Sequence, residues 1–180
     1  MKILLLTFIC GLQALNNDVK ELPQLTGEWY TVALASNVSS KIEKGGSLEM
    51  YVHKIYYNED GALCGDFFKE ENGECTKFSV RTSQENDRLK VQYDGENDIT
   101  IQHVDNECAM ILLHNVNKNE NTIWAELFGR TPYLPDKIKK QFQEMCENAA
   151  ISKDQIRDLS NEGKLCSSLF SLCDLEEKNP

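Results

Sequence analysis

Thiol and imidazole side chains are the groups in this chain that could bind a metal or act as nucleophiles. The 180 residues include seven cysteines and three histidines, and a zinc site or an activated cysteine needs these residue types close together. No Cys-x-x-Cys pair occurs, and His53, His103 and His114 are scattered along the chain. We therefore expect no catalysis, no bound metal and no other cofactor.

The amino terminus has the three-part layout of a secretory signal. Met1 and Lys2 give a positive start, residues 3–10 are apolar, and Ala14 is a small residue suited to cleavage. We predict that residues 1–14 are removed and that the protein is secreted; a buried amino-terminal strand or helix is the alternative interpretation. Export also makes Asn37, in the triplet Asn37-Val38-Ser39, a candidate for glycosylation.

Cysteines that remain after export are candidates for disulfide bridges, because disulfides persist outside the cell. Six such residues allow fifteen pairings, and their spacing alone does not choose among them. They are Cys64, Cys75, Cys108, Cys146, Cys166 and Cys173.

The charge of the chain limits its partners. Asp and Glu number 29 against 19 Lys and Arg, a formal net charge of -10. Such a chain repels nucleic acid and anionic membranes. After the amino terminus, no apolar run approaches the roughly 18 residues that a membrane-spanning helix needs. We expect neither nucleic-acid binding nor membrane insertion.

Short runs of alternating apolar and polar residues predict an all-β protein. Turn residues such as Asn58-Glu59-Asp60-Gly61 separate the runs, and connections this short require antiparallel neighbours. Eight strands of this kind form either a sandwich or an up-and-down barrel. The predicted strands are residues 28–35, 48–57, 62–69, 76–82, 88–93, 98–104, 108–115 and 122–129.

One helix follows the strands. Pro135 suits a helix start, and Asp136 places a carboxylate in the first turn, where the helix dipole favours it. Apolar residues then recur at helical spacing, at Ile138, Phe142, Met145 and Ala149. Because both faces of the two last strands are apolar, we expect one face to line the interior and the other to lie beneath this helix.

Several motifs in this order resemble the lipocalin family, most closely the rodent urinary proteins and the odorant-binding proteins. Gly27-Glu28-Trp29 opens the first strand like the Gly-x-Trp signature of lipocalins, and Arg130 closes the last strand like their final arginine. The stretches 93–97, 127–130 and 158–161 are also similar. An Arg at this place can lie over the Trp ring.

The resemblance implies an eight-stranded antiparallel up-and-down β-barrel with one carboxy-terminal α-helix packed on the outside. Residues 15–166 would form the lipocalin domain and residues 167–180 a tail. It also implies a disulfide between Cys75 and Cys166. Cys108 is then placed beneath the helix that carries Cys146, so a Cys108–Cys146 bridge is plausible, with Cys64–Cys173 completing the set.

A barrel of eight strands can enclose one small ligand. The inward set is almost wholly apolar, so the ligand should be apolar too. The predicted ligand-binding residues are Met50, Val52, Ile55, Phe67, Val80, Val91, Tyr93, Ile99, Ile111, Leu113, Trp124, Glu126 and Phe128.

Glu126 is the unusual member of the inward set. It shares the alternation of Trp124 and Phe128, so its carboxyl group should face the interior. A buried carboxylate without a partner is unfavourable. We predict that Glu126 meets Tyr93 or a water molecule, or is held neutral; a local bulge that turns it outward is the alternative. Cys64, out of step with Phe67, is expected to face outward.

These expectations describe a secreted carrier of a small hydrophobic ligand, of the odorant or pheromone type, that is a monomer or weak dimer. The competing interpretation is a secreted protein that is itself a chemosignal or binds a cell-surface receptor, with ligand carriage secondary.

Overall fold

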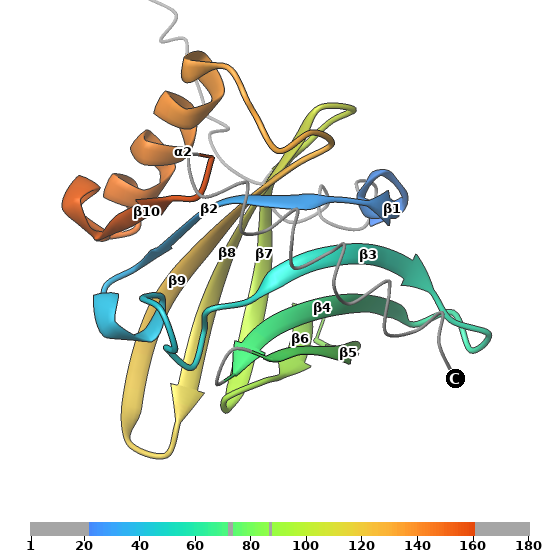
Figure 1. The fold of residues 1–180 in the computed structure, drawn as a ribbon. Helices are drawn as coiled ribbons and strands as arrows, with labels where there is room; N and C mark the ends of the chain where they lie inside the picture. Colours follow the sequence, from blue (N-terminus) through green and yellow to red (C-terminus); the bar gives the residue numbers. More distant parts are fainter. Residues whose placement is uncertain (1–21, 72–73, 87, 161–180) are drawn as a thin grey trace, which may run out of the picture.

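The described part of the chain is an antiparallel sheet curled into a barrel, with an α-helix on its outside (Figure 1). The computed structural model describes residues 22–71, 74–86 and 88–160. In this part of the chain the strands are β1 (Gly27–Glu28), β2 (Tyr30–Ser36), β3 (Tyr51–Tyr57), β4 (Leu63–Glu71), β5 (Glu74–Glu85), β6 (Arg88–Gln92), β7 (Glu96–Val104), β8 (Cys108–Asn117), β9 (Glu120–Gly129) and β10 (Ile156–Asp158).

The first strand closes the barrel, because its two parts hold opposite edges of the sheet. β1 pairs with β3, whereas β2 pairs with β9, and Trp29 alone separates β1 from β2. The Trp29 amide donates to the His53 carbonyl at 3.0 Å. Next to it, the Val52 amide donates to the Thr31 hydroxyl at 2.8 Å. The predicted all-β barrel fold is therefore confirmed.

The described residues form ten strands where eight were predicted. One extra strand arises because Trp29 divides the first predicted strand into β1 and β2. The other is β10, which pairs with the outer edge of β2. Its three residues are too few to produce a readable alternation, and the pairing depends on where the preceding helix delivers the chain.

The helix α2 (Asp136–Asn148) follows Pro135 as predicted, but its buried stripe differs from the predicted one. Ile138, Phe142 and Cys146 are buried, at intervals of four residues. Met145 is only partly buried against this cluster. Cys146 packs with the strand residues of this cluster in the place expected for Met145, and helical spacing alone does not specify that rotation of the helix. Three short 3-10 helices complete the fold: Leu22–Leu25, Ser39–Lys41 and Lys153–Gln155.

Two separate hydrophobic cores result from the two apolar faces of β8 and β9. Ile111 and Trp124 belong to the interior core, whereas Met110 and Leu127 pack with Phe142 beneath α2. The predicted division of these strands into two dry faces is therefore confirmed.

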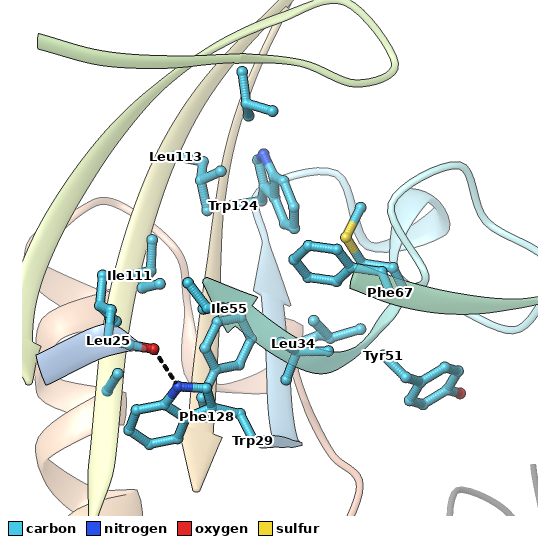
Figure 2. Close-up of a cluster of buried hydrophobic side chains, with 14 of the residues drawn as sticks. Leu25, Trp29, Leu34, Tyr51, Ile55, Phe67, Ile111, Leu113, Trp124 and Phe128 are labelled. Carbon is cyan, nitrogen blue, oxygen red and sulfur yellow. Dashed lines mark hydrogen bonds between the residues drawn. The ribbon is translucent and has the colours of Figure 1, made fainter. Parts of the chain in front are cut away.

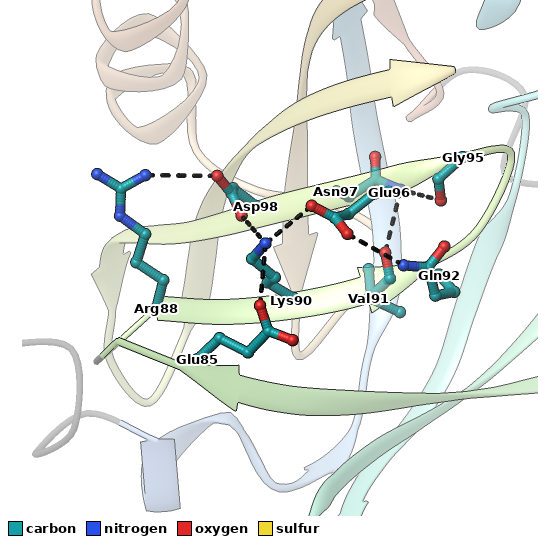
Figure 3. Close-up of polar contacts among 9 residues, drawn as sticks. All are labelled: Glu85, Arg88, Lys90, Val91, Gln92, Gly95, Glu96, Asn97 and Asp98. Carbon is teal, nitrogen blue, oxygen red and sulfur yellow. Dashed lines mark hydrogen bonds and ion pairs between the residues drawn. The ribbon is translucent and has the colours of Figure 1, made fainter. Parts of the chain in front are cut away.

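The strands farthest from α2 have one wet face. On β6, the Lys90 ammonium lies 2.8 Å from Glu96, 3.3 Å from Glu85 and 3.8 Å from Asp98 (Figure 3). Arg88 lies 3.5 Å from the same Asp98. This outer network leaves Leu89 and Val91 free to face the interior, as their alternation predicts. None of the described helices has both the length and the apolar character needed to cross a bilayer.

Candidate ligand-binding cavity

One end of the barrel is sealed by Trp29 and Arg130. The Trp29 ring is almost completely buried, and its indole N–H donates to the Leu25 carbonyl at 2.6 Å (Figure 2). The central carbon of the Arg130 guanidinium lies 3.4 Å from the centre of the Trp29 ring. The predicted cation–π contact between the two signature residues is thus present.

Three backbone carbonyls hold Arg130 in this position. Its guanidinium donates to Glu28 at 2.7 Å, to Thr26 at 2.9 Å and to Gln24 at 3.0 Å. Gly27 makes room for it: this residue has a φ of +113°, and a Cβ there would lie 2.9 Å from Arg130 Nη1. The glycine, tryptophan and arginine of the motif therefore form one interlocked unit.

An apolar cavity lies above this seal, inside the barrel. Its volume is about 80 Å³ for the centres of water-sized molecules. Because roughly 10–15 Å³ of such volume holds one water, the space suits a small organic molecule. Apart from Val52, the structure places every predicted ligand-binding residue in the wall: Met50, Ile55, Phe67, Val80, Val91, Tyr93, Ile99, Ile111, Leu113, Trp124, Glu126 and Phe128.

Val52 corrects the prediction at one position. It is fully buried in the interior core but does not line the cavity. The register of β3 against β4 shifts between Val52 and Lys54. This bulge breaks the strict alternation, and it explains how Ile55 reaches the cavity although it is out of step with Met50.

Seven further residues line the cavity. Leu63, Leu89 and Ile101 share the alternation of predicted neighbours, so the pattern itself could have identified them. Leu25 precedes the first strand and carries no periodic signal. Cys64 was expected to face outward, but it belongs to the wall. The full set is Leu25, Leu63, Cys64, Gly65, Thr82, Leu89 and Ile101.

Glu126 faces the interior from β9, so the alternative of an outward bulge is wrong. Its side chain is 4% exposed, and among the described residues its Oε1 atom has no hydrogen-bond partner. The residues opposite it are Leu34 on β2 and Ile111 on β8. Burial raises the pKa of Glu126 to about 8. The carboxyl group is therefore protonated and neutral at pH 7, which is one of the predicted outcomes.

The opposite end of the barrel is held by the loop between β2 and β3. The Tyr93 hydroxyl donates to the Ser47 carbonyl at 3.0 Å rather than to Glu126, and the Ser47 hydroxyl donates to Asp94 at 2.6 Å. Further along, the buried Glu49 carboxylate lies 2.6 Å from Arg157. The loop between β2 and β3 is thus fastened at both the β6–β7 turn and β10.

Asn37 opens the same loop. It is exposed, and its Oδ1 atom accepts a hydrogen bond from the Ile123 amide at 2.9 Å. Its glycosylation stays a prediction.

The cysteines beneath α2 do not form the predicted bridge. Cys108 and Cys146 are both buried free thiols, and Cys64 is free as well. Burial raises the pKa of Cys108 and of Cys146 to about 12, so neither is a thiolate nucleophile at neutral pH. The Cys75 side chain, Cys166 and Cys173 lie outside the described residues, as do the proposed signal and tail.

Cys108 instead belongs to a small cluster at the β7–β8 turn that sequence spacing did not reveal. Donor atoms of His103, Asp105 and Cys108 lie within 4.8 Å of one another. Burial opposes ionisation of Asp105, but the amides of Cys108 and Glu107 donate to its Oδ1 atom and lower its pKa. His103 is exposed, Asp105 is half-buried and Cys108 is buried, and none of the three lines the cavity.

Comparison with known proteins gives a consistent result. Residues 26–163 match the model of the lipocalin / cytosolic fatty-acid binding protein family. Major urinary protein 18 of Mus musculus is 29% identical over 174 residues, which cover 89% of this chain and 95% of that protein.

Two solved structures show the same fold. Odorant Binding Protein OBP1 superposes with a TM-score of 0.73 at 20% identity, covering 78% of this chain and 93% of that chain. The possum milk whey lipocalin trichosurin, from Trichosurus vulpecula, has a TM-score of 0.70 at 33% identity, covering 76% of this chain and 97% of that chain. That structure holds bound 4-ethylphenol.

Proposed function

The chain belongs to the lipocalin family, and from this premise we propose that it is a secreted carrier that binds small hydrophobic molecules of the odorant or pheromone type reversibly in its barrel. The observation that carries the proposal is the cavity itself, an apolar space inside the barrel between the Trp29 seal and the Ser47 loop. The 4-ethylphenol bound by trichosurin is a ligand of the expected size and character.

The chemistry of the wall supports reversible binding. Burying roughly 300 Å² of apolar ligand surface at about 25 cal/mol per Å² stabilises the complex by ~7 kcal/mol, before the cost of association is subtracted. Even before that cost, ~7 kcal/mol corresponds to an affinity no tighter than roughly micromolar, so the wall supports reversible uptake and release rather than irreversible capture. Secretion is supported by the signal-like amino terminus and by a relative that is named as a urinary protein.

Displacement of a fluorescent apolar probe, such as N-phenyl-1-naphthylamine, tests the proposal. We expect the probe to brighten on binding and to be displaced by volatile ketones, alcohols and phenols at micromolar concentrations. If neither the probe nor any volatile is taken up, the carrier function is wrong, and a role of the protein itself as a chemosignal or receptor ligand becomes the better explanation.

A pair of variants on β5 locates the binding. Val80 faces the cavity, so Val80→Trp should fill it and weaken probe binding at least tenfold. Arg81, its exposed neighbour, faces solvent, and Arg81→Trp should bind the probe like the unmodified protein. Equal binding by both variants would place the probe elsewhere on the molecule.

A further inference from the structure

The polar side chains of the cavity wall differ in one respect: whether their hydrogen-bonding capacity is already used. The Tyr93 hydroxyl donates to the Ser47 carbonyl at 3.0 Å, and the Thr82 hydroxyl donates to the Leu63 carbonyl at 2.9 Å. The Trp124 indole donates to Asn97 at 3.0 Å. Cys64 Sγ lies 3.7 Å from the Ala62 carbonyl. Each of these donors is therefore committed to the protein.

Glu126 is the polar residue of the wall whose hydrogen-bonding capacity is not used within the described part of the chain. Its Oε1 atom has no hydrogen-bond partner among the described residues, and its strand neighbours Leu34 and Ile111 offer only apolar surface. A buried polar group in this state is unfavourable until something satisfies it. Since the group faces the cavity, the ligand is the molecule in position to do so.

We propose that Glu126, as a neutral carboxylic acid, donates a hydrogen bond to an oxygen atom of the ligand, so that the cavity prefers molecules with an apolar body and one carbonyl or hydroxyl oxygen. The inference rests on the proposed carrier function and specifies the ligand class. A carboxylic acid offers one O–H donor together with acceptor oxygens. It can therefore donate its O–H to a ketone oxygen, and it can either donate to an alcohol oxygen or accept a hydrogen bond from the alcohol hydroxyl.

The protonation state gives the proposal a distinct pH signature. Burial raises the pKa of Glu126 to about 8, so the donor is present at neutral pH and is lost as the pH rises above that value. The other ionisable side chains of the wall are the Tyr93 phenol and the Cys64 thiol. Affinity for a ketone should therefore fall above pH 8, whereas affinity for a primary amine, which pairs with the carboxylate, should rise.

The experiment compares ligands of matched length, namely 2-heptanone, heptane and heptylamine, by probe displacement between pH 6 and 9. Because the ketone gives up hydrogen bonds to water on binding and heptane does not, the informative quantity is the ratio of ketone affinity to heptane affinity. A hydrogen bond of ordinary strength predicts that Glu126→Leu lowers this ratio roughly fivefold to tenfold at pH 6–7. Glu126→Gln, whose amide still donates and has no proton to lose, should keep the ratio near that of the unmodified protein at pH 6–7 but lose its pH dependence; a dependence that persists in this variant would come from Tyr93 or Cys64, which the substitution leaves in place.

The possible results separate this inference from the carrier function. Failure of every ligand to displace the probe would refute the carrier function. Uptake of all ligands, with an equal ketone preference in the unmodified protein and in Glu126→Leu, would refute the role of Glu126 alone. Tighter binding of the amine than of the ketone at pH 7 would also refute it. The pH titration of the unmodified protein decides the matter if a variant does not fold.

Discussion

At the scale of single residues, the sealed end of the barrel depends on the shape of the Arg130 side chain. Its planar guanidinium covers the Trp29 ring while donating to three carbonyls. A lysine carries the same charge but lacks the fork of donors and the flat face. The contact is therefore specific to arginine, although charge alone would not distinguish the two residues.

Arg130→Lys should lower the free energy of unfolding by about 1–3 kcal/mol, because carbonyls that now accept from the guanidinium lose their donors. Urea unfolding measures the change. Arg88→Lys is the matched control, since the Arg88 side chain is 71% exposed, and it should change stability by less than about 0.5 kcal/mol. A similar loss in both variants would show that the Trp29 contact does not matter.

At the scale of elements, alternation predicted most strands and the position of the helix, because hydrophobic burial on one face leaves a regular trace in the sequence. It failed where geometry departs from regularity. The bulge in β3 brought Ile55 to the cavity wall out of step with Met50, and the three residues of β10 were too few to produce a readable alternation. The turn that gathers His103, Asp105 and Cys108 brings together residues whose spacing resembles no metal motif.

The candidate site was predictable to a similar extent and for the same reason. Glu126 could be assigned to the interior because it keeps step with Trp124 and Phe128. The lack of a hydrogen-bond partner for Glu126 could not be predicted from the sequence. It depends on the Tyr93 hydroxyl binding the Ser47 carbonyl instead, and these two residues are 46 positions apart in the chain. Leu25 could not be assigned either: it lies only four residues before Trp29, whose indole donates to its carbonyl, but it precedes the first strand and belongs to no alternating run.

The packing of α2 against the sheet leads to a prediction at the scale of elements. Phe142 is buried between α2 and the sheet, in a cluster separate from the cavity. Phe142→Ala should destabilise the protein by about 3–5 kcal/mol, measured by thermal unfolding, while probe affinity of the folded protein stays unchanged. Glu144→Ala, on the exposed side of the helix, is the control. A large loss of affinity in folded Phe142→Ala would mean that the two cores are coupled.

At the scale of the whole molecule, Glu126 links folding to pH. The pKa of its carboxyl group is about 8 in the folded protein and about 4.3 in an unfolded chain. The stability it contributes as a neutral acid is therefore fully present below about pH 4.3 and is lost as the pH rises to about 8. The loss is about 1.4 kcal/mol per pH unit at most.

Unfolding free energies measured between pH 5 and pH 8 should consequently fall more steeply for the unmodified protein than for Glu126→Gln, which has no proton to lose. Asp105 and Asp158, whose pKa values are lowered in the folded protein, lose their contribution to stability only as the pH falls below about 4, so they do not affect the slope between pH 5 and pH 8. Parallel pH profiles would show that the carboxyl group is solvated or paired.

The two dry faces of β8 and β9 also constrain how this protein can diverge. Every position along these strands that borders the ligand is flanked by one that borders the helix, so a mutation here disturbs either cargo choice or scaffold, and polar replacements are costly on both sides. Strands such as β6, with a solvated outer surface, can vary there freely. Substitutions that change ligand specificity are therefore expected mainly at inward-facing positions of β4 to β7, whereas the residues of β8 and β9 should change less.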